Sequence, residues 1–232
     1  MRVVPPGRPP VVVTRPQPEA DRWCTALAAA GWSGVALPLI TIEPLTGDAA
    51  VGHCRAGVAG YAAVFCVSAQ AVHAFWGATP PTWGPETRFW APGPGTAKAL
   101  SGLGVPPTRI NSPAPDAEQF DSEALWAVVG AGLRPGDRVL VVRGGGPQTP
   151  AGSTGQGRDW LAQRCAAAGA LVDWCVAYRR TPPVWGAAQR GAAQQALDQG
   201  ALWVFSSSEA VQNLAQLWPS FPWGRMRALA TH

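Results

Sequence analysis

The chain contains an internal repeat. The segment Asp21–Gly31 returns as Asp159–Gly169 at an offset of 138, and Ser68–Val72 returns as Ser207–Val211 at an offset of 139. Two unrelated local patterns that recur at almost the same offset indicate a duplicated folding unit. A duplication of this kind predicts two similar lobes with a ligand-binding cleft between them.

Strand and helix patterns alternate along the chain. Val11–Val13 is a short β-branched run that predicts a buried strand, and residues 19–30 form an Ala-rich helical pattern. Val35–Ile42 and Ala63–Val67 are expected as further strands, and Ser68 stands where the next helix needs an N-cap. This alternation predicts an α/β fold with parallel sheets flanked by helices.

Ligands of parallel α/β sheets bind in the loops that follow the carboxyl ends of the strands. In this sequence these loops hold hydroxyls, glycines and arginines, and hardly a carboxylate. They comprise residues 14–16, 68, 92–96, 143–158 and 206–208. The composition of the loops predicts an anionic ligand.

Composition excludes several classes of protein. The net charge is +4, yet the basic residues are dispersed, so no nucleic-acid-binding stripe is expected and a small polyanion suits the charge better. No segment has the length of a membrane span or the apolar core of a secretory signal. Five cysteines without a CxxC pair suit a reducing compartment, so we expect a cytoplasmic protein. The three histidines lack partners at ligand spacing, so no metal site is expected.

Some candidate residues admit two interpretations. Ser68 and Ser207 are either simple helix caps or hydroxyls that face a shared anion with the helix N-termini. The Gly93–Thr96 turn is either a tight turn before a helix or an anion contact. Tyr178, in the expected strand 172–178, is either an edge-strand aromatic or a proton donor near a leaving group.

Taken in order, the motifs of the chain resemble those of the uroporphyrinogen-III synthase family. The matching segments cover nearly the whole sequence: Val13–Pro16, Gly31–Pro38, Ile42–Pro44, Val64–Val72, Gly95–Ala97, Leu140–Gly144, Gly157–Arg158, Ala177–Arg180 and Val204–Val211. The resemblance implies two α/β lobes joined by a two-stranded linker. Residues 1–36 and 182–232 are expected to form one lobe and residues 46–172 the other, with 37–45 and 173–181 as linker strands. We also expect the second copy to lack a final helix and strand.

The resemblance implies a lyase of porphyrin and haem biosynthesis that cyclises hydroxymethylbilane to uroporphyrinogen III, with inversion of ring D and loss of water. It implies Tyr178 as the catalytic proton donor and no cofactor. The substrate is rich in carboxylates, and the residues expected to bind it are Arg15, Ser68, Thr96, Arg143, Arg158, Arg179, Ser206 and Ser207.

The expected state is a monomer, which could receive its linear tetrapyrrole from hydroxymethylbilane synthase. The residues also leave open an alternative in which the chain is a binding protein and not an enzyme. Such a protein would have the same two lobes and basic charge and would bind a small polyanion without converting it.

Overall fold

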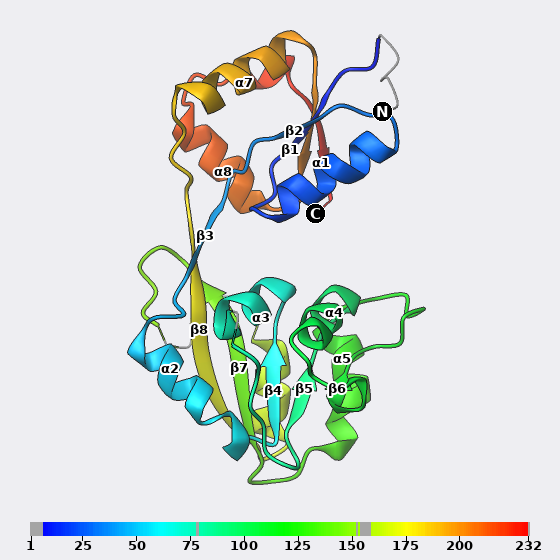
Figure 1. Ribbon diagram of the computed structural model, residues 1–232, viewed down its shortest axis with the longest axis vertical. Coiled ribbons are helices and arrows are strands. Elements are labelled where there is room, and N and C mark those ends of the chain that lie inside the picture. Colours follow the sequence, from blue (N-terminus) through cyan, green and yellow to red (C-terminus); the bar gives the residue numbers. More distant parts are fainter. Residues whose placement is uncertain (1–6, 78, 152, 154–158, 232) are drawn as a thin grey trace. The chain divides into compact units, whose positions relative to one another are not determined.

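The computed structural model describes residues 7–77, 79–151, 153 and 159–231, and it divides into two compact units (Figure 1). Unit 1 is built from both ends of the chain, up to Ile42 and from Arg180 onward. Unit 2 is the continuous segment Glu43–Arg179. The first unit is therefore discontinuous in sequence, and the second is inserted into it.

Unit 1 is a four-stranded parallel sheet with helices on its faces. The strand order is β10-β9-β1-β2. The strands are β1 (Val11–Val13), β2 (Gly34–Ala36), β9 (Leu202–Phe205) and β10 (Arg227–Ala230), and the helices are α1 (Glu19–Ala29), α7 (Ala187–Asp198) and α8 (Ser208–Leu217). A 3-10 turn, η4 (Trp223–Arg225), precedes β10.

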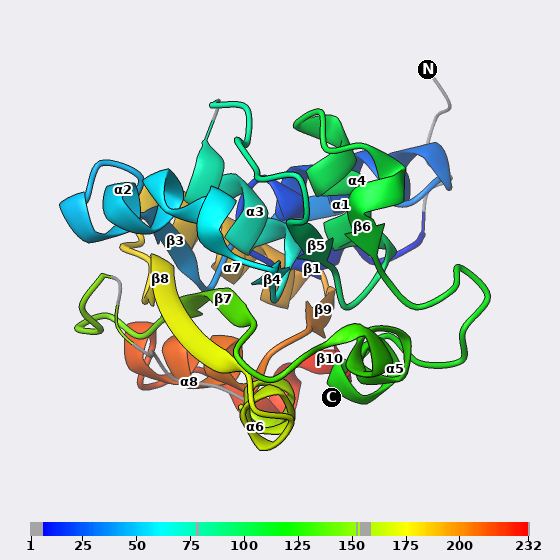
Figure 2. The ribbon, with the colours of Figure 1, turned by 90° about the horizontal axis from the view of Figure 1, so that it is seen from below.

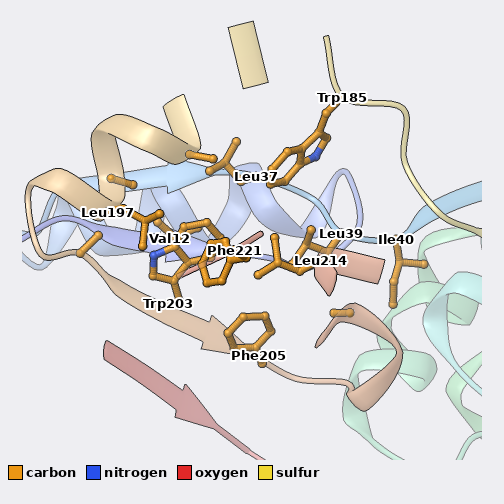
Figure 3. Close-up of a cluster of buried hydrophobic side chains, with 14 residues drawn as sticks. Val12, Leu37, Leu39, Ile40, Trp185, Leu197, Trp203, Phe205, Leu214 and Phe221 are labelled. Atoms are coloured by element: carbon orange, nitrogen blue, oxygen red, sulfur yellow. The ribbon is translucent and has the colours of Figure 1, made fainter. Parts of the chain in front are cut away.

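The core of unit 1 lies between its sheet and the helices α7 and α8 (Figure 3). Trp203 is one of two tryptophans in this core and is fully buried, with Phe221 edge-on at 5.5 Å between ring centroids. Burying a side chain of this size stabilises a fold by about 3 kcal/mol. On the sheet's other face α1 packs so closely on β2 that a Cβ at Gly34 would lie 2.9 Å from Cys24 Cα.

The expected strand Val35–Ile42 is wrong in part, because the structure divides it. β2 ends at Ala36, and β3 (Thr41–Pro44) belongs to unit 2's sheet. The backbone between them bonds to other elements: Leu39 N donates to Thr14 O at 3.1 Å, and Leu39 O accepts from Asn213 Nδ2 at 2.8 Å. Pro38 has no N–H for a strand ladder, so the chain leaves the sheet there.

Unit 2 is a six-stranded sheet in the order β3-β8-β7-β4-β5-β6. Its further strands are β4 (Ala63–Cys66), β5 (Arg88–Trp90), β6 (Ile110–Asn111), β7 (Arg138–Gly145) and β8 (Leu171–Thr181). Its helices are α2 (Ala49–Ala56), α3 (Ala69–Trp76), α4 (Pro94–Gly102), α5 (Ser122–Val129) and α6 (Trp160–Ala167). Three 3-10 turns complete it: η1 (Val58–Gly60), η2 (Pro107–Arg109) and η3 (Gly130–Gly132).

Helices cover both faces of this sheet (Figure 2). Alternate residues of β4 and β7, such as Phe65 and Val141, pack in one cluster with Leu125 of α5 and Leu161 of α6. The intervening strand residues point to the opposite face, where α3 contacts α4 and β7. Strands buried on both faces explain the nearly continuous apolar runs in the sequence. No helix of the described residues has the length and apolar character needed to cross a bilayer.

The sequence repeat reappears as a repeat of strand pairing. Ala63 of β4 pairs with Arg88 of β5, and 139 positions later Leu202 of β9 pairs with Arg227 of β10. β1 in unit 1 corresponds to β7 in unit 2. β1 lies between β9 and β2, β7 lies between β4 and β8, and all four pairings are parallel. Each unit therefore combines the first half of one copy with the second half of the other.

Candidate active site

Tyr178 lies in β8 directly beside Gly144 of β7. A Cβ added to Gly144 would stand 2.4 Å from Tyr178 Cζ, so the phenol ring occupies the space that a side chain at position 144 would need. Tyr178 is 5% exposed. The glycine is thus required for the tyrosine to lie flat on the neighbouring strand, where packing holds the ring in one orientation.

An irregularity in the ladder places Tyr178 there. Arg143 pairs with Val176, but the next residue, Gly144, pairs with Tyr178, so Ala177 is an extra residue on β8. The carbonyl of Ala177 accepts a hydrogen bond from Leu45 N at 2.8 Å. A bulge of this kind redirects the side chains that follow it, which is how bulges serve sites at the ends of strands.

Arg143 is one of two expected substrate-binding residues that are buried in the described part of unit 2, the other being Thr96. Its guanidinium is paired with Asp159 at 2.6 Å and stacks over the Trp174 ring at 5.0 Å from the centroid. Only 6% of its side chain is exposed. Asp159 precedes α6 and Trp174 lies in β8, so Arg143 links β7 both to the start of α6 and to β8.

Arg179 follows Tyr178 and contacts the loop after β7. Its Nε donates to Thr149 O at 2.9 Å, and Thr149 also packs against Gly145, where an added Cβ would lie 2.5 Å from Thr149 Cβ. Arg179 lies at the carboxyl end of the sheet, because it pairs with Gly145 at the end of β7. Arg158 lies outside the described residues.

Ser68 and Thr96 begin helices at the same edge of unit 2's sheet. Ser68 Oγ accepts from Ala71 N at 3.2 Å and caps α3. Cys66 pairs with Val142, so continuing the register by two residues brings Ser68 level with Gly144, itself paired with Tyr178. Thr96 is buried in the first turn of α4, after β5. Ser68, Thr96, Tyr178 and Arg179 are therefore brought to one edge of the sheet.

Unit 1 places Arg15 at the end of β1, in the position that Arg143 has in unit 2. The preceding Thr14 donates from Oγ1 to Val204 O at 2.7 Å and ties the ends of β1 and β9 together. Arg15 stacks over Trp23 at 5.4 Å from the ring centroid. Its Nε is buried and has no hydrogen-bond partner among the described residues. In contrast with Arg143, it forms no ion pair with any of them.

Ser206 and Ser207 follow β9 at the same edge as Arg15. Ser207 Oγ accepts from Glu209 N at 3.2 Å and caps α8, as Ser68 caps α3. Ser206 is half-buried between strand and helix. Next to them Arg180 Nε is paired with Glu209 at 2.9 Å. The capping interpretation of both serines is confirmed, and their second interpretation, as anion contacts, stays a prediction.

Sequence reasoning missed several residues on which this arrangement depends. Gly144, Thr149, Asp159 and Trp174 hold the expected residues in place, but each acts across strands or loops that are far apart in sequence. The repeat offered one signal, since Asp159 is the counterpart of Asp21. Within unit 2 a cavity of about 520 Å³ lies at the opposite, amino-terminal edge, near Ala62, Arg88 and Arg134, and is separate from these residues.

Comparison with known proteins identifies the family. The model of the family described as uroporphyrinogen-III synthase HemD matches residues 21–231. The fold is similar to a mutant uroporphyrinogen III synthase from Thermus thermophilus, with a TM-score of 0.55, 16% identity, and coverage of 96% of this chain and 84% of that one. It is also similar to the uroporphyrinogen-III synthetase of Helicobacter pylori, with a TM-score of 0.52, 11% identity and the same coverages, 96% and 84%.

These two structures confirm the expected fold class, a pair of α/β units with parallel sheets flanked by helices. The family match covers far more than half of the sequence and contains both copies of the repeat. The chain belongs to the uroporphyrinogen-III synthase family.

Proposed function

We propose that this chain closes hydroxymethylbilane into uroporphyrinogen III with Tyr178 as proton donor and with strand-end loops of each unit as the groups that bind the substrate. Membership of the family makes the chain a cyclising lyase of tetrapyrrole biosynthesis. The observation that supports these residue roles is the Tyr178–Gly144 contact, a phenol fixed at the carboxyl edge of a parallel sheet.

The reaction needs a leaving group and a controlled ring closure. The hydroxyl of the substrate departs as water once its oxygen receives a proton, and the phenolic O–H of Tyr178 can donate that proton. The resulting electrophilic carbon is then attacked by the substituted carbon of ring D. The bond from that carbon to the methylene bridge of ring C breaks, and the methylene bonds to the unsubstituted α carbon of ring D. That carbon loses a proton, which restores the phenol, and ring D is inverted in the product. The substrate is reactive by itself, so holding its two ends together supplies most of the catalysis.

The substrate's carboxylates require several cationic or N–H donors. Arg15 and Arg179 have guanidinium groups at the carboxyl edges of their sheets, and charge-assisted hydrogen bonds to carboxylates are among the stronger polar contacts in proteins. The helices α3 and α8 direct their N-termini to the same edges beside Ser68 and Ser207. Ser206 and Thr96 complete the proposed set, and Arg158 is retained in it from the sequence motif.

The decisive experiment identifies the product isomer. Hydroxymethylbilane generated freshly by hydroxymethylbilane synthase is mixed with the protein, and the products are oxidised and separated by chromatography. We expect the type III isomer, against type I from the same mixture without the protein. Type I alone in both mixtures would overturn the proposed function and would favour a binding protein without turnover.

The cellular setting is also part of the proposal. We infer a monomeric, cytoplasmic enzyme that receives its unstable substrate from hydroxymethylbilane synthase. Support comes from the reactivity of the substrate, which closes by itself if it is released for long. Sedimentation of the chain alone and mixed with the synthase measures both the oligomeric state and the hand-over complex.

A further inference from the structure

Unit 1 has a cavity of about 380 Å³ between its helices α7 and α8, among residues that have no part in the proposed reaction. Three places contribute to the lining: the segment before α7, one side of α7 and the end of α8. The described residues that line the cavity are Trp185, Arg190, Gly191, Gln194, Leu217 and Trp218. Ligand sites in proteins have volumes of about 300–1,000 Å³, so this cavity has the size for one small molecule.

Two tryptophans form much of the apolar lining, and contacts with residues outside the cavity hold both of them. Trp185 is 5% exposed, and its Nε1 donates to Pro38 O at 3.4 Å. Figure 3 shows Trp185 beside Leu37, in the core cluster of unit 1. Trp218 follows α8 and packs edge-on against Phe221, with 5.2 Å between the ring centroids. Aromatic rings fixed in this way favour the binding of a flat apolar group, because little freedom is lost when it binds.

Gly191 borders the cavity from the interior of α7. Glycine destabilises the interior of a helix relative to alanine. A Cβ added at this position would meet no atom within 4 Å, so close packing does not require a glycine there. The missing side chain therefore leaves the cavity wider, and a larger residue at position 191 would fill part of it.

Arg190 is the only charged residue among the described residues of the lining. Its guanidinium forms no hydrogen bond or ion pair with any residue that the structure describes. Asp198, the carboxylate one turn beyond Gln194 on α7, accepts from Gln194 Nε2 at 3.1 Å and from Arg225 at 3.2 Å. Arg190 thus places a cation without a described partner at the side of an apolar cavity, and the planar guanidinium matches the geometry of a carboxylate.

We propose that this cavity, defined by the six residues of its lining, is a binding site for a small planar aromatic carboxylate. The aromatic ring system contacts Trp185 and Trp218, and the carboxylate pairs with Arg190. An aromatic cation is disfavoured because Arg190 would repel it. The linear tetrapyrrole is excluded because its many carboxylates require more cations than this one arginine. The site lies within unit 1 and does not depend on the proposed function.

The affinity of the full chain for two matched probes tests the ligand class. Indole-3-acetate has the ring and the carboxylate, whereas indole-3-acetamide has the ring and no charge, and both are titrated by saturation-transfer NMR. We expect a Kd of about 1 mM or lower for indole-3-acetate, as is usual for a ligand of about 13 non-hydrogen atoms, and binding of the amide that is about fivefold weaker. Equal affinities for the two probes, or no binding of indole-3-acetate, would overturn the proposal.

The Gly191→Leu variant tests the location. The leucine side chain should fill the cavity and weaken indole-3-acetate binding by about tenfold or more, while the denaturation midpoint stays at or above the parent value because leucine is the better helix former. Gly52→Leu on α2 is the matched control, since a Cβ added at Gly52 also meets no atom within 4 Å, and it should bind the probe as the parent does. If Gly191→Leu retains the parent affinity, the probe binds elsewhere and the proposed site is wrong.

The Arg190→Gln variant tests the role of the charge. It should weaken the binding of indole-3-acetate about fivefold and leave the binding of indole-3-acetamide unchanged. Arg227→Gln removes the same charge from β10, outside the lining of the cavity, and should leave both affinities at the parent values. Equal losses of affinity in the two variants would show that the net charge attracts the probe and that Arg190 does not bind it.

Discussion

Two arginines at equivalent places in the two units differ in what they can do. Arg143 is held by Asp159 and Trp174, whereas Arg15 has an aromatic neighbour, a buried Nε without a partner among the described residues, and no ion pair with any of them. A guanidinium that already meets a carboxylate has less capacity to bind another. We therefore assign the main substrate contact of the pair to Arg15.

Substitution by glutamine should separate these two roles. Arg143→Gln removes the ion pair with the half-exposed Asp159 and the stacking on Trp174, and it should lower the free energy of unfolding by about 1–2 kcal/mol, measured by urea denaturation. Arg15→Gln should leave stability close to the parent value and raise KM about tenfold, because a hydrogen bond to a charged group is worth about 1.5 kcal/mol. A large loss of stability at Arg15 with an unchanged KM would contradict this assignment.

Tyr178 can be tested against the other tyrosine of the chain. Tyr178→Phe keeps the ring on Gly144 but removes the proton donor, so kcat should fall by about tenfold or more. Tyr61→Phe loses only a hydrogen bond from Arg138 and should retain the parent kcat. Ser207→Ala should slow turnover less than Tyr178→Phe. If the Tyr178 and Ser207 variants both show negligible effects, the phenol has no part in the mechanism.

At the scale of elements, helix starts and strand ends meet at one edge of each sheet. Ser68 and Ser207 both cap their helices, α3 and α8, as the repeat in the sequence already indicated, although Ser68 accepts from the N–H three residues on and Ser207 from the N–H two residues on. The strands and most helices were predictable because their patterns are local. The division of Val35–Ile42 and the bulge at Ala177 were not, since both depend on bonds to residues far away in sequence, such as Thr14 and Leu45.

The candidate site was predictable to a similar extent. Tyr178 and the strand-end hydroxyls follow from motifs and from the rule that parallel sheets bind ligands at carboxyl edges. The contact of Tyr178 with Gly144 does not follow from the sequence, because no local pattern around either residue indicates that the two pair. The same holds for the burial of Arg143, which depends on Trp174, a residue of the next strand.

A negative charge at position 68 should show whether Ser68 only caps α3 or also contacts the substrate. Aspartate caps helices about as well as serine, so Ser68→Asp should retain the stability of the parent, whereas Ser68→Ala should lose about 1 kcal/mol. If the hydroxyl faces a substrate carboxylate, Ser68→Asp should also raise KM about fivefold, since like charges about 4 Å apart in water repel by about 1 kcal/mol. An unchanged KM would leave Ser68 as a cap alone. Denaturation and steady-state kinetics provide the two measurements.

At the scale of the whole molecule, the net charge of +4 complements a polyanionic substrate. Attraction of this kind is screened by salt, so kcat/KM should fall as ionic strength rises from about 0.01 M to about 0.2 M, while kcat changes little. The rate is measured at a series of KCl concentrations, with the denaturation midpoint followed in parallel as a control for stability. A kcat/KM that does not respond to salt would argue against steering by charge.

The discontinuity of unit 1 has a consequence for how the protein is made. A ribosome delivers β1 and β2 first, then the whole of unit 2, and only afterwards β9, the strand that pairs with the other edge of β1. Until Leu202–Phe205 have been synthesised, the valines of β1 have an open, apolar edge, while the uninterrupted segment Glu43–Arg179 can already fold. Synthesis thus supplies the whole of the inserted unit before the enclosing one is complete, and β1, which precedes the other strands described, is among the last to be protected from aggregation.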